Sequence, residues 1–283
     1  MQLQRPFLKW AGGKTKLVPI IRGLVPAEAK RLIEPFVGSG AVALNLDLPA
    51  AILADRNADL MGLYRELKRG GKRFIARCAE LFTPEANSAE VYYARRAEFN
   101  ATKDRRRKAA LFVYLNRHGY NGLCRYNSRG GFNVPFGRYV APGFPGVALS
   151  AFHQRLAGCQ LEAADFRPIL AAAGPGDFVY CDPPYVPASN TANFTAYSRT
   201  AFGPAEQAAL AAAGRAAAQR GACVVISNHD NPTTRELYAD ADERHELLVG
   251  RRISCRPGGR TAVPELIVVY RPRGQRRGIE TAA

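Results

Sequence analysis

The apolar positions of the chain gather in short runs that are separated by glycine-rich turns or by helical patterns. RLIEPFVGSG, residues 31–40, is an apolar run that leads into a glycine-rich turn, and AVALNL after it is typical of a helix start. AAILAD at 50–55 predicts a second short strand that ends in an acid. We therefore expect this part of the chain to fold as strand, turn, helix and strand.

Two more runs of the buried-strand type lie in the second half of the chain. They are DFVYCDPPY (177–185) and ACVVISNHD (222–230), separated by an alanine-rich helical pattern over 204–220 that Gly221 closes. Strands that alternate with helices predict a parallel sheet. HELLVGRRISCR (245–256) and PELIVVYRP (264–272) flank a Gly-Gly turn, which predicts a terminal hairpin that adds one antiparallel strand.

The stretch between these halves has a different character. It is first helical and charged, then rich in glycine, asparagine and aromatic residues, and it ends at a boundary rich in proline and glycine. We interpret residues 59–145 as an inserted module and residues 1–58 with 146–270 as one discontinuous domain. Residues 271–283 are expected to form a basic, disordered tail.

Length and composition narrow the class of protein. At ~150 residues per domain, 283 residues are enough for about two domains, and a hydrophobic content of 47% argues against wholesale disorder. No apolar run approaches the roughly 18 residues that a membrane span needs, and the N-terminus lacks a secretory apolar region. The sequence therefore predicts a cytoplasmic globular protein.

Charge indicates the kind of partner. Lys and Arg number 40 against 24 Asp and Glu, a net charge of +16, which favours a polyanion. Segment 103–138 holds nine of these cations and one acid, Asp104. The six cysteines include no CxxC pair, so we expect reduced, mostly buried thiols, with disulfides as the alternative.

The turn Gly38-Ser39-Gly40 follows a predicted strand, and Asp55 ends the next one. Glycines there let the backbone approach a ligand, and a carboxylate at that strand end is placed to accept both hydroxyls of a ribose. The GxGxxG pattern of nicotinamide enzymes is absent because position 43 is Ala. The alternative is an ordinary glycine turn and a solvated acid.

The N-terminal segment WAGGKT (10–15) resembles a phosphate-binding loop only in part. GxxxxGK[ST] would need a glycine at position 8, which is Leu8, and no strand precedes the segment. A nucleoside triphosphatase is therefore disfavoured. Lys14 in a tight loop fits a ligand that bears a carboxylate, whereas the alternative is a surface lysine in a flexible N-terminus.

The tetrapeptide Asp182-Pro183-Pro184-Tyr185 ends a predicted strand and is the most specific motif. The amino group of adenine is a poor nucleophile, because its lone pair is delocalised into the ring. The Asp182 carboxylate and the Pro183 carbonyl are acceptors that can hold the amino hydrogens. Two prolines stiffen the turn, and Tyr185 offers a face on which an extruded base can stack. The alternative is an ordinary Asp-Pro-Pro turn.

Together the motifs resemble the DNA adenine methylase (Dam) family over about residues 6–270. They are WAGGK (10–14), EPFVGSG (34–40), LADRN (53–57), YLNRHGYNGLCRYN (114–127), FNVPFGRY (132–139), YCDPPY (180–185), FTAY (194–197) and SNHD (227–230). The resemblance implies an α/β fold. Its parts are a Rossmann-like methyltransferase sheet, mostly parallel with one antiparallel strand, and an inserted, mainly helical DNA-recognition domain that carries a β-hairpin.

The resemblance also implies a donor, a substrate and site residues. The donor is S-adenosyl-L-methionine, and the substrate is duplex DNA, in many members at GATC. DPPY (182–185) matches the catalytic tetrapeptide of the family. The cofactor-binding positions implied are Trp10, Lys14, Phe36, Gly38, Gly40, Asp55, Asp165 and Asp182. No metal ligand and no obligate protein partner are implied, and we expect a monomer.

The inserted module is expected to read DNA. Arg125 can donate to both major-groove acceptors of a guanine, and NGLCRYN resembles the family there. Tyr120 and Asn121 are expected to fill or support the gap that a flipped base leaves. Other positions that match DNA-facing residues of the family are Lys9, Leu123, Pro135 and Arg138. Residues 105–108 either touch phosphate or form a solvated helix face.

Two other functions remain open from the residues alone. One is adenine methylation of RNA, since DPPY-like tetrapeptides recur among RNA-modifying enzymes, although an A-form major groove is too narrow for Arg125 to read. The other is a DNA-binding protein without catalysis. His229-Asp230 is interpreted as a hydrogen-bonding pair at a strand end, and Cys181 as a buried thiol rather than a covalent catalyst.

Overall fold

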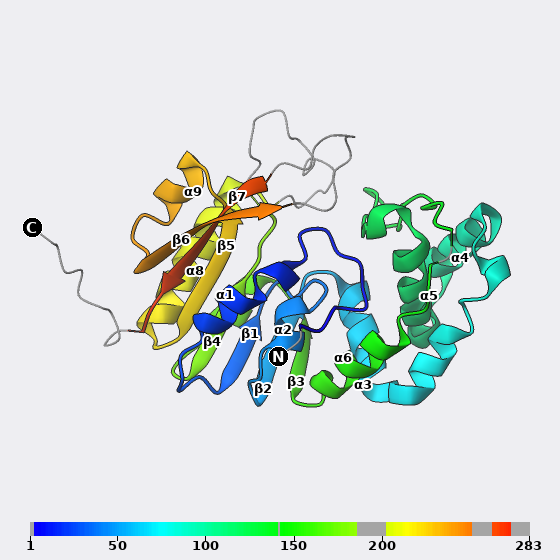
Figure 1. The fold of residues 1–283 in the computed structure, drawn as a ribbon, viewed down its shortest axis with the longest axis horizontal. Coiled ribbons are helices and arrows are strands. Elements are labelled where there is room, and N and C mark those ends of the chain that lie inside the picture. The colour runs from blue at the N-terminus through cyan, green and yellow to red at the C-terminus, as the bar shows by residue number, and fades with distance from the viewer. Residues whose placement is uncertain (1–2, 141, 186–201, 251–261, 273–283) are drawn as a thin grey trace, which may run out of the picture.

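A computed structural model describes residues 3–140, 142–185, 202–250 and 262–272, and it contains one seven-stranded sheet (Figure 1). The strand order is β3-β2-β1-β4-β5-β7-β6. The bounds are β1 Arg31–Glu34, β2 Ala50–Asp55, β3 Cys159–Ala163, β4 Asp177–Cys181, β5 Cys223–His229, β6 Glu243–Gly250 and β7 Ala262–Tyr270.

The sheet is parallel except for one strand. β1 pairs in parallel with β2 on one side and with β4 on the other, and β3 and β5 extend the parallel set. β7 is antiparallel to both β5 and β6. The mostly parallel α/β sheet with one antiparallel strand, supplied by a terminal hairpin, is therefore confirmed.

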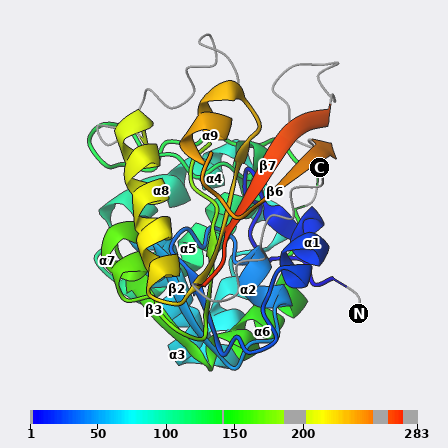
Figure 2. The same ribbon diagram turned by 90° about the vertical axis from the view of Figure 1, so that its left-hand side faces the viewer.

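Alternate residues of the strands face two hydrophobic layers. In β1, Leu32 belongs to the layer under α1 and α2, and the next residue, Ile33, belongs to the layer under α7 and α8. Figure 2 shows these helix pairs on opposite faces of the sheet. The helices are η1 Lys14–Lys16, α1 Val18–Gly23, α2 Ala41–Asn45, α7 Phe166–Ala171, α8 Pro204–Gln219 and α9 Pro232–Leu237.

A helical part lies between β2 and β3 in the sequence and beside the sheet in space (Figure 1). Its elements are α3 Ala58–Ala79, η2 Pro84–Ala86, α4 Ala89–Ala101, α5 Arg105–His118, η3 Tyr120–Gly122 and α6 Gly146–Leu156. Side-chain N-caps fix the first turns of α3, α4 and α5. The capping residues are Asn57, Ser88 and Asp104, which accept hydrogen bonds from first-turn N–H groups of these helices in that order. The β-hairpin expected here is present only as two antiparallel bridges, Gly119 with Phe136 and Tyr126 with Phe132.

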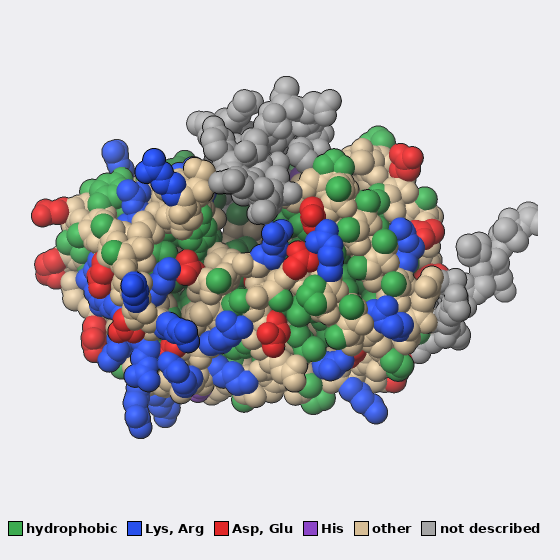
Figure 3. Space-filling model, turned by 180° about the vertical axis from the view of Figure 1, so that it is seen from behind, with side chains coloured by type: hydrophobic (Ala, Val, Ile, Leu, Met, Phe, Trp, Pro, Cys, Tyr) green, Lys and Arg blue, Asp and Glu red, His purple; other side chains and the backbone are tan. Residues whose placement is uncertain are grey.

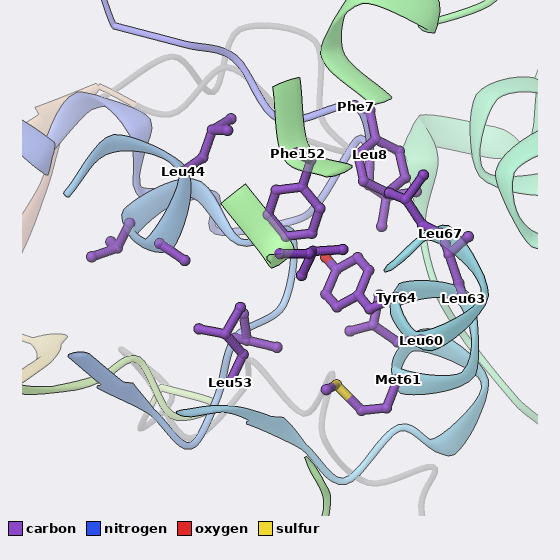
Figure 4. Close-up of a cluster of buried hydrophobic side chains, with 14 of the residues drawn as sticks. Phe7, Leu8, Leu44, Leu53, Leu60, Met61, Leu63, Tyr64, Leu67 and Phe152 are labelled. Atoms are coloured by element: carbon purple, nitrogen blue, oxygen red, sulfur yellow. The ribbon is translucent and has the colours of Figure 1, made fainter. Parts of the chain in front are cut away.

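The core reaches from the sheet into this helical part. Figure 4 shows Phe7 packed beside Tyr64 of α3 and Phe152 of α6; the Phe7 ring lies 6.1 and 5.5 Å from theirs, and those two rings lie 4.8 Å apart. All three rings are fully buried. The N-terminal segment is therefore anchored between the sheet and the helices that follow β2, so its next residues have fixed positions.

Several expectations concern residues outside the described ranges. They are FTAY (194–197), the Gly-Gly turn of the hairpin, Cys255 and the tail from residue 273 onward. Within the described ranges, five cysteines are free, and all but Cys124 are buried. No helix in these ranges has the length and apolar character to cross a bilayer.

Candidate active site

Three parallel strands, β1, β2 and β4, end at the same edge of the sheet and carry the candidate residues there. The glycine turn at 38–40 follows β1, Asp55 ends β2, and Asp182 comes directly after β4. Because the carboxyl ends of adjacent parallel strands open a crevice, this edge is the usual ligand site of such sheets. The fold thus brings together motifs that are 144 residues apart in the case of Gly38 and Asp182.

Asp182 is held by two donors, and both use the same oxygen. Lys14 Nζ lies 2.9 Å from Asp182 Oδ1, and the Ser227 hydroxyl donates to Oδ1 at 3.2 Å. Among the residues that the structure describes, none donates to Oδ2. The carboxylate is partly exposed, with 22% of its side chain accessible. One oxygen of Asp182 is therefore fixed by the protein, and the other can accept a hydrogen bond from a ligand.

Lys14 is a buried cation, not a surface lysine. Only 7% of the residue is exposed, and its ammonium also donates to the Gly12 carbonyl at 2.7 Å and lies 4.6 Å from the centre of the Tyr185 ring. Burial of a lysine costs free energy unless a carboxylate pairs with it. Asp182 supplies that charge, so the WAGGK and DPPY motifs form one unit.

The rest of the DPPY turn is fixed by distant elements. Gln207 of α8 donates to the Pro184 carbonyl at 2.7 Å, and Asn228 of β5 donates to Gln207 at 3.0 Å. The Tyr185 hydroxyl donates to Glu265 of β7 at 3.3 Å. The tetrapeptide is therefore held in one conformation from α8, β5 and β7.

The glycine turn and Asp55 are joined directly. Gly38 N–H donates to Asp55 Oδ2 at 3.1 Å, and Asn57 N–H donates to Oδ1 at 2.9 Å. Burial raises the pKa of Asp55, while these two N–H groups oppose the rise. Each carboxylate oxygen has two lone pairs, so Asp55 retains acceptor capacity for two hydroxyls.

Trp10 packs on the glycine turn. Gly38 has a φ of +47°, and a Cβ there would lie 2.7 Å from Trp10 Nε1. Gly40, the N-cap residue of α2, has a φ of +70°, and a Cβ there would lie 2.5 Å from the Phe152 ring. Both glycines are thus required by conformation and by close contact.

Phe36 and Asp165 lie on the other side of the crevice, after β1 and β3. The Phe36 ring stacks on Phe166 at 5.6 Å and meets Phe202 edge-on at 5.6 Å. Asp165 caps α7 and pairs with Arg167 at 3.0 Å, and hydrogen bonds and charge from Arg167 hold its pKa below the ordinary value against desolvation. The three rings form an apolar wall suited to a planar group.

The residues expected to face DNA lie in one loop region and in the N-terminal segment. Tyr120, Arg125, Pro135 and Arg138 are exposed, and Lys9, Asn121 and Leu123 are partly buried. Arg125 Nε donates to Asn133 Oδ1 at 2.9 Å, and its Nη2 donates to the Asn133 carbonyl at 3.2 Å. The Arg125 guanidinium is thus held at the surface by Asn133.

This loop contacts the end of β2. Asn57 Nδ2 donates to Cys124 Sγ at 3.2 Å, and the Tyr126 hydroxyl donates to Asp59 at 2.9 Å. Asn57 also holds Asp55. The loop expected to read DNA is therefore connected by hydrogen bonds to the crevice.

The basic run at 105–108 is largely paired within the protein. Lys108 lies 3.0 Å from Asp59, Arg107 donates to Glu98 at 2.8 Å, and Arg106 lies 3.7 Å from Glu66. These pairs favour the solvated-face interpretation for three of the four residues. Seen from behind, Lys and Arg side chains gather over the helical end of the molecule (Figure 3).

The long helix α3 carries a row of exposed cations. They are Arg65, Lys68, Arg69, Lys72, Arg73 and Arg77. A hollow of about 680 Å³ lies beside the first three of them and the edge strand β3. None of the candidate site residues lines this hollow, so it is separate from the crevice.

Sequence reasoning missed the residues that support the site from other elements. Gln207 and Glu265 belong to no recognised motif. Ser227 belongs to the SNHD motif (227–230), but the sequence assigned no role to it. The hydrogen-bonding role expected for Asp230 is met by an ion pair with Arg235 at 2.6 Å. Cys181 is fully buried, and burial raises the pKa of its thiol, which fits an inert strand residue.

Comparison with known proteins identifies the family. Residues 10–251 match the model of the D12 class N6 adenine-specific DNA methyltransferases. The DNA adenine methylase of Escherichia coli K12 is 47% identical over 96% of this chain and 97% of that protein, and that of Serratia marcescens is 47% identical over 96% and 100%. The DNA adenine methylase of Vibrio cholerae is 45% identical over 96% and 98%.

Among solved structures, the rRNA methyltransferase aviRa of Streptomyces viridochromogenes aligns with a TM-score of 0.37 and 16% identity, over 94% of this chain and 89% of that one. A likeness this low carries no weight. The match over most of the chain and the identity to the curated relatives do carry weight: the chain belongs to the D12 class of N6 adenine-specific DNA methyltransferases.

Proposed function

We propose that this adenine-specific DNA methyltransferase uses S-adenosyl-L-methionine as donor, acts on a flipped adenine in duplex DNA and recognises GATC. The observation that carries the proposal is the Lys14–Asp182 ion pair of 2.9 Å at the strand edge where Gly38 and Asp55 also lie. It joins the residues expected to hold the donor to those expected to hold the base.

The residues of the crevice fit the donor by their chemistry. Asp55 would accept the ribose hydroxyls, and Lys14 would attract the donor carboxylate while holding Asp182. Phe36 with Phe166 would flank the donor's adenine, beside Asp165. When bound, S-adenosyl-L-methionine supplies an electrophilic methyl group on a sulfonium. The positive φ of Gly38 lets the backbone come close to such a ligand.

Asp182 and Pro183 would activate the amino group of the target adenine. Oδ2 of Asp182 accepts one amino hydrogen and the Pro183 carbonyl accepts the other, which localises the lone pair on nitrogen. Tyr185 stacks on the extruded base. The amino nitrogen would then bond to the methyl carbon as the bond from that carbon to sulfur breaks, with S-adenosylhomocysteine as the leaving group. The extra proton on the amino nitrogen would pass to the Asp182 carboxylate or to water, so no covalent enzyme intermediate is needed.

Replacement of Asp182 tests this chemistry. We expect Asp182→Ala to lower labelled-methyl transfer to duplex DNA by about 100-fold or more, the scale of losing one preorganised polar contact. Asp177→Asn is the matched control, because Asp177 begins the same strand and pairs with Arg31 at 2.7 Å, away from the crevice. A near-normal rate for Asp182→Ala would refute the assigned role, and transfer to structured RNA in preference to duplex DNA would refute the substrate.

Replacement of Arg125 tests sequence recognition. A bidentate guanine contact contributes ~1–3 kcal/mol of discrimination, so Arg125→Ala should reduce the preference for GATC over singly altered sites by roughly 5- to 150-fold. Arg129→Ala is the control in the same exposed loop, and it should leave the ratio of rates between sites unchanged. An unchanged ratio in Arg125→Ala would exclude Arg125 as a reader of the sequence.

A further inference from the structure

Asn116 is a buried amide that holds two distant segments of the chain together. It lies in the last turn of α5 and is 1% exposed. Its Oδ1 accepts Lys9 N–H at 2.8 Å, and its Nδ2 donates to the Lys9 carbonyl at 2.8 Å and to the Gly122 carbonyl at 3.2 Å. All of the hydrogen-bond donors of this side chain are used by backbone of the two segments.

The two segments are also in direct contact. Gly122 has a φ of +62°, and a Cβ there would lie 2.1 Å from Lys9 Cβ. Lys9 Nζ donates to the Arg117 carbonyl at 3.1 Å and lies 3.6 Å from the centre of the Tyr139 ring. Because Gly122 packs directly against the Lys9 side chain and close-packed atoms cannot interpenetrate, a displacement of one segment displaces the other.

Each segment leads to a different candidate site. Lys9 is followed directly by Trp10, which packs on Gly38 of the donor crevice, and five residues after Lys9 comes Lys14, which pairs with Asp182. Gly122 is followed by Leu123 and the exposed Arg125 of the loop expected to read DNA. Asn116 therefore stands at the junction between the two.

We propose that Asn116 is a positioning residue that couples donor binding to DNA binding. The inference rests on the proposed function, since it takes the crevice as the donor site and the loop as the DNA site. A ligand that shifts the Lys9–Trp10 backbone shifts the Gly122 loop through the same amide, and the effect is reciprocal. Typical coupling between two sites changes each affinity 5- to 150-fold.

The test measures this coupling as a ratio of affinities. The Kd of S-adenosylhomocysteine, which cannot donate a methyl group, is measured without DNA and with a saturating duplex that contains GATC. The Kd of the duplex is measured without and with S-adenosylhomocysteine. For the unaltered protein we expect each ratio to be 5 or more, and for Asn116→Ala we expect a ratio near 1.

Two further variants make the result specific. Asn100→Ala is the matched control: Asn100 accepts Phe132 N–H at 2.8 Å and donates to the Phe132 carbonyl at 3.1 Å, so its hydrogen bonds hold the same loop region and do not involve the N-terminal segment. It should retain the coupling. Gly122→Ala keeps the amide but forces the segments apart, so it should lower the ratio even if Asn116→Ala does not fold.

The outcomes separate the inference from the proposed function. Equal ratios in the unaltered protein and Asn116→Ala would overturn the inference, as would an equal loss in Asn100→Ala. A ratio of 1 in the unaltered protein, with both ligands bound, would overturn the inference and leave the proposed function standing. Failure of the unaltered protein to bind S-adenosylhomocysteine or DNA would overturn the proposed function, and the inference with it.

Discussion

Burial of the Glu34 carboxyl group predicts how the stability of the protein depends on pH. It ends β1, is 2% exposed, and its Oε2 has no hydrogen-bond partner among the described residues. Desolvation raises the pKa of Glu34 to about 8; the Ala43 N–H opposes the rise and the charge of Asp182 adds to it. The folded protein therefore keeps Glu34 protonated at neutral pH.

The pKa difference fixes the sign and the size of the effect. The unfolded chain loses this proton near pH 4.5, whereas the folded protein keeps it until about pH 8. The folded state thus binds more protons between these values, so the free energy of unfolding falls as pH rises through the window. Each pH unit in this window lowers the free energy of unfolding by about 1.4 kcal/mol. Because pH 7 lies two and a half units above 4.5, the free energy of unfolding is about 3 kcal/mol lower there.

Glu34→Gln removes this proton linkage while keeping the shape of the side chain. We expect the free energy of unfolding of the variant, minus that of the unaltered protein, to increase by about 3 kcal/mol between pH 4 and pH 7. Urea unfolding followed by circular dichroism at four pH values measures it. Glu98→Gln is the control, because the hydrogen bond from Arg107 lowers the pKa of Glu98. A difference that stays constant across pH 4–7 would refute the reasoning.

Two other substitutions follow from local geometry. Gly38→Ala should lower the free energy of unfolding by about 1–3 kcal/mol and weaken S-adenosylhomocysteine binding, because of its positive φ and the Trp10 contact. Gly62 in α3 has open space around it, so Gly62→Ala should leave the free energy of unfolding unchanged or raise it. If calorimetry found that Gly38→Ala and Gly62→Ala change stability equally, the argument from the Gly38 geometry would be wrong. Burial lowers the pKa of His118 to about 4, so stability is full above pH 6.5 and falls towards pH 4. When the pH is lowered from 7 to 4.5, the free energy of unfolding of the unaltered protein should fall by about 2 kcal/mol more than that of His118→Gln. If the free energies of both proteins changed in parallel with pH, His118 would not be the cause.

The strongly apolar strands were predictable from the sequence, and the exposed edge strand was not. Ala50–Asp55 and Asp177–Cys181 are buried over most of their length, so their apolar runs carry the signal. Cys159–Ala163 lies at the sheet edge with a mostly exposed or partly exposed pattern, so its sequence CQLEA gives little sign of a strand. The hairpin expected in the helical part is reduced to the two bridges Gly119–Phe136 and Tyr126–Phe132.

The residues of the candidate site that belong to a sequence motif were predictable. Asp182 and Asp55 stand at strand ends that the sequence marks. The partners that fix them are set by tertiary contacts: Ser227 reaches Asp182 from 45 residues away, and Glu265 reaches Tyr185 from 80. Such partners have no local pattern, because any hydroxyl or carboxylate at the right place would serve. The domain limits at 59 and 145 stay a prediction.

The order of the strands has a consequence for how the protein is made. β1 lies in the interior of the sheet beside the central strand β4, yet β4 is encoded far downstream, and the Arg31–Asp177 ion pair spans 146 residues. During synthesis, β1 and β2 leave the ribosome with one side open until the whole helical part has been translated. Loop closure of this length slows folding, so nascent chains that end before β4 should be the form most prone to aggregation and most dependent on chaperones.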